Sequence, residues 1–151
     1  SKDIPKRILL CRLPLIGSFI VRGLNGFAGP ATFMAVKNSL PKDVKNGFLF
    51  PYNNWSKRIA VWRFVKDIPY EKNHPTRLLL KETEDSLKNY HDTPILACWG
   101  MKDFCFHGGF LDSWQKRLPH IIAHKFENAG HYLLEDDFEG CRSKIEPFLF
   151  N

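Results

Sequence analysis

The fold of this chain is decided by two stretches, Pro94–Asp103, which is PILACWGMKD, and Ile121–His131, which is IIAHKFENAGH. Each begins with a short apolar run typical of a buried strand and ends in polar turn residues. Asp103 follows the first run and His131 follows the second. If the two strands are parallel neighbours, both side chains emerge at the carboxyl edge of the sheet, where open α/β sheets place their chemistry.

The expected pairing of Asp103 with His131 suits acid–base chemistry. An aspartate beside an imidazole fixes the tautomer and stabilises the protonated ring, so we expect the two side chains to lie roughly 2.6–3.2 Å apart. The pair forms two parts of a nucleophile–histidine–acid triad. The nucleophile is absent from this chain, since it contains no G-x-S-x-G or G-x-D-x-G turn. The alternative is that both are ordinary turn residues, because aspartate is common after strands.

Residues 1 to about 90 favour helices, whereas residues 94–151 alternate between strand and helix patterns. The first part contains an apolar stretch from Leu13 to Leu24, predicted helices over 31–40, 51–65 and 76–90, and a turn at Asn46–Gly47. The second part predicts, in order, a strand over 94–99, a helix over 109–118, a strand over 121–126 and a helix over 136–149. The short connections favour parallel strands.

A sheet of two parallel strands is unusually small and leaves two apolar edges unpaired. We therefore expect residues 94–151 to belong to a larger sheet, whose other strands lie in the same or another chain. The chain alone is expected to aggregate, to pair with another chain, or to be one fragment of a nicked protein.

Composition indicates a globular domain. The 151 residues are 44% hydrophobic and 25% charged, which is enough to bury a core. The net charge is +6, but the basic residues are scattered and are densest over 2–12, so we interpret them as solvated surface and expect no nucleic-acid partner. A phosphate-binding patch or an anionic membrane surface is the alternative. Four cysteines without C-x-x-C spacing, no secretory signal and no transmembrane segment favour a cytoplasmic protein.

Two motifs carry a resemblance to a known family. The pattern WG-x-x-D at Trp99–Asp103 and the pattern NAGHY-x-x-ED at Asn128–Asp136 resemble the C-terminal third of the α/β-hydrolases. The most similar branch is that of the haloalkane dehalogenases, which also contains epoxide hydrolases. Pro51–Tyr52 and Arg58–Pro69 resemble the end of the helical cap that these enzymes insert after the sixth core strand.

Within that branch, two further stretches resemble the β-lactone decarboxylases of bacterial long-chain olefin synthesis. They are Cys11–Gly17, which is CRLPLIG, and Cys98–Phe106, which is CWGMKDFCF.

The resemblance implies an α/β fold class, namely the C-terminal portion of an α/β-hydrolase fold. A helical cap over 1–75 would be followed by core residues 76–151, with two parallel strands and flanking helices, and strands one to six would precede Ser1. Asp103 would be the triad acid and His131 the general base. The nucleophile, an aspartate in this branch, and the oxyanion donors would lie in the N-terminal α/β core. Some relatives carry the acid after the sixth strand instead, which would place it outside this chain.

Other candidate residues are weaker. Phe104, Phe106 and Trp55 are candidates for lining a substrate pocket, although an aromatic residue at helical spacing, such as Trp55, is more often packing. His107–Gly109 is interpreted as the start of a helix. The remaining histidines lack metal-ligand spacing, and we expect neither metal nor cofactor, because a carboxylate nucleophile and water suffice.

The function that follows is covalent chemistry on an apolar small molecule, of the dehalogenase or β-lactone decarboxylase type, in a protein that includes the missing core. The alternatives are a haloalkane dehalogenase, an epoxide hydrolase, or a non-catalytic partner chain that lacks the nucleophile. The chain alone is expected to be inactive.

Overall fold

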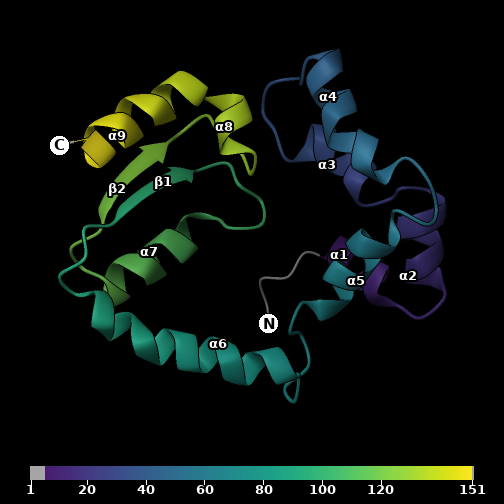
Figure 1. The fold of residues 1–151 in the computed structure, drawn as a ribbon, viewed down its shortest axis with the longest axis horizontal. Helices are drawn as coiled ribbons and strands as arrows, with labels where there is room; N and C mark the ends of the chain where they lie inside the picture. Colours follow the sequence, from purple (N-terminus) through teal and green to yellow (C-terminus); the bar gives the residue numbers. More distant parts are fainter. Residues whose placement is uncertain (1–5, 151) are drawn as a thin grey trace. The chain divides into compact units, whose positions relative to one another are not determined.

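The computed structural model describes residues 6–150 (Figure 1). The expectation that Ser1 directly follows a sixth strand lies outside the described residues. The chain divides into two compact units, and each is described by itself. One unit contains the residues up to Met34 together with Ser39–Arg77, and the other contains Ala35–Asn38 together with the residues from Leu78 onward.

The first unit is built from short helices. They are α1 (Lys6–Arg12), α2 (Ile16–Ser18), a π-helical turn (Phe19–Gly23), α3 (Ala28–Met34), α4 (Lys42–Leu49), a 3₁₀ turn (Phe50–Tyr52) and α5 (Ile59–Asp67). Its core is formed by Cys11, Val21 and Val65, which bring α1, the π-helical turn and α5 together.

The predicted boundaries in this unit are partly wrong. The helix expected over 31–40 ends at Met34, and Pro41 stands before α4 rather than closing α3. A proline can follow the end of one helix or precede the start of the next. Its missing N–H breaks a helix interior, but its fixed φ is tolerated at a helix start. Asn46–Gly47, expected as a turn, lies inside α4, since tertiary context overrides a single unfavourable glycine.

The helix expected over 51–65 is also interrupted. Pro51 lies in the 3₁₀ turn, and α5 begins only at Ile59. Between them the Asn54 side chain accepts the Lys57 N–H at 3.0 Å, a local turn that competes with helix.

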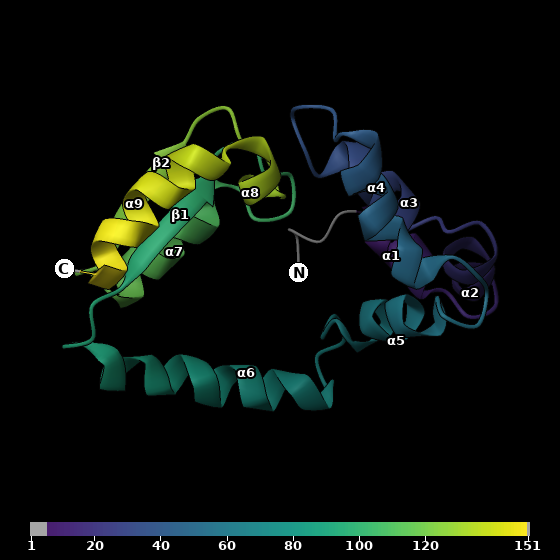
Figure 2. The same cartoon turned by 45° about the horizontal axis from the view of Figure 1, so that its top comes forward.

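The second unit contains the sheet. Its elements are α6 (Pro75–Ser86, which begins in the first unit), a 3₁₀ turn (Leu87–Tyr90), β1 (Leu96–Gly100), α7 (Gly108–Arg117), β2 (Ile122–Phe126), α8 (Leu133–Asp136) and α9 (Phe138–Phe150). The strands pair in parallel, with Leu96 opposite Ile122 and Gly100 opposite Phe126, which confirms the predicted direction. Helices α7 and α9 cover opposite faces of this sheet (Figures 1 and 2).

The sheet is held by side chains from both flanking helices. Leu111 on α7 and Cys141 on α9 are fully buried. The single helix expected over 136–149 is divided at Asp137, whose carboxylate accepts the Gly140 N–H at 2.9 Å and so begins α9.

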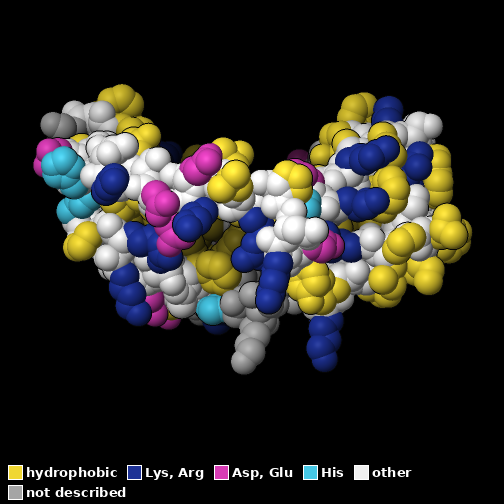
Figure 3. Space-filling view, turned by 90° about the horizontal axis from the view of Figure 1, so that it is seen from below, with side chains coloured by type: hydrophobic (Ala, Val, Ile, Leu, Met, Phe, Trp, Pro, Cys, Tyr) yellow, Lys and Arg dark blue, Asp and Glu magenta, His cyan; other side chains and the backbone are white. Residues whose placement is uncertain are grey.

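Within residues 6–150, no helix has the length and hydropathy needed to cross a bilayer. The surface of the first unit, on the right in Figure 3, mixes exposed hydrophobic side chains with lysines and arginines.

Candidate active site

Backbone hydrogen bonds continue past the strands and bring two loops together. The Met101 N–H donates to the Phe126 carbonyl at 3.0 Å, and the Lys102 N–H donates to the Ala129 carbonyl at 2.9 Å. The loop after β1 therefore runs against the loop after β2, and these loops carry Asp103 and His131.

The close approach of the loops depends on Gly100. A Cβ at this position would meet the carbonyl oxygen of Gly130 and would lie 2.8 Å from the carbonyl oxygen of Ala129. Glycine is therefore required at the end of β1, because any side chain would push the second loop away.

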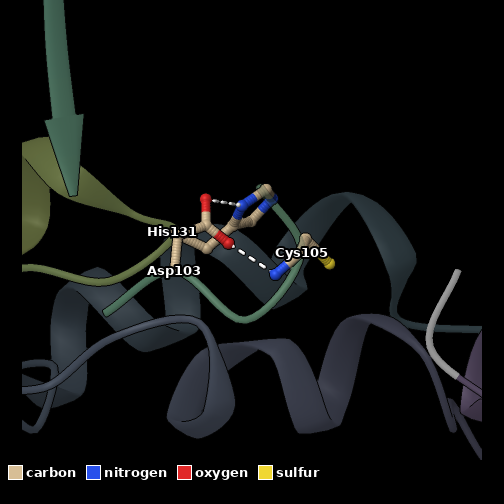
Figure 4. A group of neighbouring side chains, drawn as sticks. All are labelled: Asp103, Cys105 and His131. Atoms are coloured by element: carbon tan, nitrogen blue, oxygen red, sulfur yellow. Dashed lines mark hydrogen bonds and ion pairs between the residues drawn. The ribbon is translucent and has the colours of Figure 1, made fainter. Parts of the chain in front are cut away.

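Asp103 and His131 form the expected pair (Figure 4). Oδ2 of Asp103 lies 2.8 Å from Nδ1 of His131, which confirms the predicted distance. The Asp103 side chain is 9% exposed and that of His131 is 30% exposed. A carboxylate partner places the ring proton on Nδ1, which leaves Nε2 as the basic nitrogen. The catalytic roles of both residues stay predictions.

The other oxygen of Asp103 holds its own loop. Oδ1 accepts the N–H groups of Cys105 at 2.7 Å and Phe106 at 2.9 Å. These two backbone N–H groups fix the orientation of the carboxylate independently of the imidazole. Such an arrangement is typical of a fixed acid rather than a mobile surface group.

Aromatic side chains surround the imidazole. The ring centroid of His131 lies 6.1 Å from that of Phe104, 5.5 Å from that of Phe106 and 5.9 Å from that of Tyr132. Phe104 and Phe106 thus lie beside His131, and both remain about half exposed. Trp55 belongs to the first unit, where Arg22 stacks on its ring at 4.3 Å, so its predicted pocket role stays a prediction.

An apolar cavity of about 340 Å³ lies elsewhere in the second unit. Its walls include Tyr90, Leu96 and Trp114, and neither Asp103 nor His131 lines it. The aromatic surface beside the acid–base pair is instead made by Phe104, Phe106 and Tyr132.

One group of side chains in the described range has ligand spacing for a metal ion. The ligand atoms of Asp103, Cys105 and His131 lie within 4.8 Å of one another. In Figure 4 the thiol points away from the carboxylate–imidazole pair. Burial raises the pKa of the Cys105 thiol, and the Asp103 charge raises it further. Both carboxylate oxygens of Asp103 are already engaged, one with His131 and one with the backbone of its own loop, so this group fits an acid–base pair better than a metal centre.

His107 lies at the start of α7, as the sequence predicted, and its side chain caps the helix by accepting the Gly109 N–H.

The structure also shows one residue that the sequence analysis did not single out. Asp136, noted only as the last letter of a motif, binds the backbone directly before His131. Its place five residues after the histidine was the only sequence signal.

Comparisons with known proteins cover nearly the whole chain. No family model matches the sequence. The chain is 35% identical over 150 residues to a cis-3-alkyl-4-alkyloxetan-2-one decarboxylase of Shewanella oneidensis, covering 99% of this chain and 47% of the relative. It is 32% identical over 149 residues to a decarboxylase of the same name from Xanthomonas campestris pv. campestris, covering 99% of this chain and 50% of the relative.

The fold is similar to solved haloalkane dehalogenases. DatA from Agrobacterium tumefaciens C58 superposes with a TM-score of 0.84 at 19% identity, covering 99% of this chain and 53% of that chain. DbeA from Bradyrhizobium elkani USDA94 gives a TM-score of 0.84 at 19% identity, covering 95% of this chain and 50% of that chain.

The chain spans about half the length of the curated relatives it matches. The expected fold class is confirmed, since the solved structures that share this fold are α/β-hydrolases and are matched over about half of their length. The chain therefore has the fold of the C-terminal part of the haloalkane dehalogenases, and it is similar in sequence, over nearly its whole length, to two cis-3-alkyl-4-alkyloxetan-2-one decarboxylases.

Proposed function

We propose that this chain supplies the helical cap and the acid–base pair of an enzyme that removes CO₂ from a cis-3-alkyl-4-alkyloxetan-2-one. The observation that carries the proposal is the 2.8 Å hydrogen bond between Asp103 and His131 at the carboxyl edge of two parallel strands. Sequence likeness to two decarboxylases over 99% of the chain supports the choice of substrate class.

The proposed division of labour is close to that of the two units, except that Ala35–Asn38, within the proposed cap, groups with the second unit. Residues 1–75 form the cap and residues 76–151 form the C-terminal part of the core. The nucleophile and the oxyanion donors come from an N-terminal α/β core in the same or another chain. The twofold greater length of the curated relatives supports this division.

The proposed chemistry begins with an aspartate of the N-terminal core. Its carboxylate attacks C4, the alkyl-bearing ring carbon that is bonded to the ring oxygen. A C–O bond from C4 to the enzyme forms, and the bond from C4 to the ring oxygen breaks. The freed substrate carboxylate then leaves as CO₂. The electron pair of the broken C–C bond forms the alkene, and the C–O bond to the aspartate breaks. No water is consumed, and neither a metal nor a cofactor is expected.

In this proposal the imidazolium of His131 donates its Nε2 proton to the aspartate carboxylate as the ester C–O bond breaks. The neutral imidazole then takes that proton back, which restores the aspartate carboxylate for the next attack and leaves no net proton change. Asp103 holds the proton on Nδ1 and stabilises the imidazolium, so Nε2 is the nitrogen that exchanges a proton with the reacting groups. Phe104 and Phe106 supply an apolar wall that suits alkyl chains. The four free cysteines fit a reducing, cytoplasmic location.

A haloalkane dehalogenase is the second candidate, and the fold neighbours favour it. There the aspartate would displace halide, and Nε2 of His131 would activate a water that hydrolyses the alkyl ester. This route consumes one water for each turnover, whereas decarboxylation consumes none.

The test uses the chain joined to an N-terminal core that restores strands one to six. A cis-dialkyl β-lactone and a 1-haloalkane are offered separately, and alkene, CO₂ and halide are measured. We expect alkene and CO₂ in equal amounts from the lactone. Halide release without alkene would favour the dehalogenase, and neither product would favour a non-catalytic partner chain.

The variant His131→Ala tests the base. We expect turnover to be lost while a covalent ester accumulates, visible by mass spectrometry as a protein mass increase. His120→Ala is the matched control, because this histidine contacts only the Thr93 carbonyl among the described hydrogen bonds. Full turnover in His131→Ala would show that His131 is not the base.

A further inference from the structure

The carboxylate of Asp136 accepts three backbone N–H groups. Oδ1 accepts from Lys37 at 2.7 Å and from Asn38 at 3.0 Å, and Oδ2 accepts from Gly130 at 2.7 Å. Hydrogen bonds from amides to a carboxylate are short and stronger than neutral ones. Asp136 therefore joins two backbone segments that lie about ninety residues apart in sequence.

These bonds hold the backbone on both sides of His131. Gly130, directly before it, donates to Asp136. Tyr132, directly after it, donates to the carbonyl of Ala35 at 2.8 Å. Both restraints lead to the segment Ala35–Asn38, which groups with the second unit although its neighbours in sequence belong to the first.

The packing leaves the loop little room to move. A Cβ at Gly130 would lie 2.9 Å from the Ala35 carbonyl oxygen and 3.3 Å from Oδ2 of Asp136. Ala35 is 2% exposed and Ala129 is 2% exposed. The loop that carries His131 is therefore fitted between the end of β1 and the segment Ala35–Asn38.

We infer that Asp136 is a positioning residue for His131 and that Ala35–Asn38 is part of the same scaffold. Asp103 fixes the imidazole ring, and Asp136 fixes the backbone from which the ring projects. General acid–base catalysis needs both, because a small displacement of the base lengthens the proton transfer. The inference rests on the proposed function, in which His131 is the base.

Asp136→Asn is the decisive variant, and Asp137→Asn is its matched control. An asparagine offers one acceptor oxygen, so its NH₂ group must face either Gly130 or the pair Lys37 and Asn38. Asp137 is the adjacent carboxylate and accepts from Gly140 at the start of α9, outside the His131 loop. Both variants are made in the chain joined to its N-terminal core.

With the β-lactone as probe, we expect Asp136→Asn to lower kcat about 10- to 100-fold with KM little changed. The dependence of kcat on pH should shift, because the imidazole is no longer held against Asp103. Asp137→Asn should keep the kcat, KM and pH profile of the parent. Asp136→Glu, which keeps the charge and both acceptor oxygens, should recover part of the lost kcat.

A proton NMR measurement covers the case in which a variant folds poorly. The Nδ1–H signal of His131 should be sharp in the parent and in Asp137→Asn, and shifted or broadened in Asp136→Asn. Parent-like kcat, pH profile and Nδ1–H signal in the Asp136 variants, with His131→Ala inactive, would overturn this inference alone. Full turnover in His131→Ala would overturn the proposed function instead.

Discussion

The two units use charge in opposite ways. The first unit carries 13 Lys and Arg against 4 Asp and Glu, a net charge of +9, whereas the second unit, which includes Lys37, carries 9 against 12, a net charge of −3. In the first unit the guanidinium groups of Arg12 and Arg58 donate to backbone carbonyls. In the second unit the carboxylates of Asp103 and Asp136 accept backbone N–H groups.

The difference shows which backbone groups need side-chain hydrogen-bond partners in each unit: carbonyls in the first and N–H groups in the second. Short helices leave carbonyls without partners at their carboxyl ends, and an arginine with five donors can satisfy several of them. Loops that follow strands leave N–H groups free, and a carboxylate can gather those. The candidate site lies in the unit where carboxylates arrange loops.

The largest effect should come from Asp103→Asn, which tests whether the acid of the proposed triad lies in the second unit. An asparagine favours the wrong imidazole tautomer, so we expect kcat to fall by about 10⁴-fold with the fold intact. Steady-state kinetics of the protein with its N-terminal core would measure this. Trp55→Ala, in the first unit, should change KM for long alkyl chains rather than kcat. A small effect of Asp103→Asn would place the acid elsewhere, as in relatives that carry it after the sixth strand.

The next largest effects are losses in the free energy of unfolding, and they test whether each unit has its own hydrophobic core. Leu111→Ala removes a side chain that is 0% exposed, and we expect a loss of about 2–5 kcal/mol in the free energy of unfolding of the second unit. Val65→Ala, also at a site that is 0% exposed, should cost about 2 kcal/mol in the first unit. Hydrogen exchange separates the two, because each variant should increase exchange mainly in its own unit. Equal increases in both units would mean that they unfold together.

Arg12→Met tests the guanidinium–carbonyl contacts of the first unit. Arg12 donates to the carbonyls of Val65, Lys66 and Ile68 at 2.6–2.9 Å and pairs with Glu71. Losing these bonds should cost about 2–3 kcal/mol in stability.

Two further measurements sharpen the Arg12 experiment. Arg12→Lys should recover only part of the loss, since an ammonium cannot reproduce the planar fork. The hydrogen bond from Arg12 lowers the pKa of Glu71, so that pKa should rise in Arg12→Met when followed by NMR titration. An unchanged Glu71 pKa would show that the pair does not form in solution.

The smallest effect is expected at alkaline pH and concerns a buried thiol of the second unit. Burial raises the pKa of Cys141 to about 11, and the neighbouring Cys98 and Asp137 raise it as well. The folded state therefore holds the thiol proton more tightly than the unfolded chain. Its contribution to stability is complete below about pH 9 and should be lost as pH rises toward 11.

Denaturant unfolding between pH 8 and 11 measures that loss. The stability difference between the parent and Cys141→Ala should shrink with rising pH. A constant difference across this range would show that the thiol does not titrate with the fold.

Much of the second unit was predictable because its signals are local. Apolar runs of strand length end in glycine and polar turn residues, and β1 and β2 lie within two residues of the expected bounds. The Asp103–His131 pair followed from the same runs, because parallel strands bring their carboxyl ends to one edge. The first unit was less predictable, since Pro41 can end one helix or begin the next and local pattern does not choose between them.

The sequence by itself therefore determined the parallel strands and the acid and histidine that follow them. It also shows that neither a G-x-S-x-G nor a G-x-D-x-G turn occurs in this chain. Only the tertiary structure decided how the histidine loop is held, because Lys37 and Asp136 are separated by 99 positions and no periodic pattern connects them. A backbone N–H donor carries no side-chain signature, so its partner is visible only after the chain has folded.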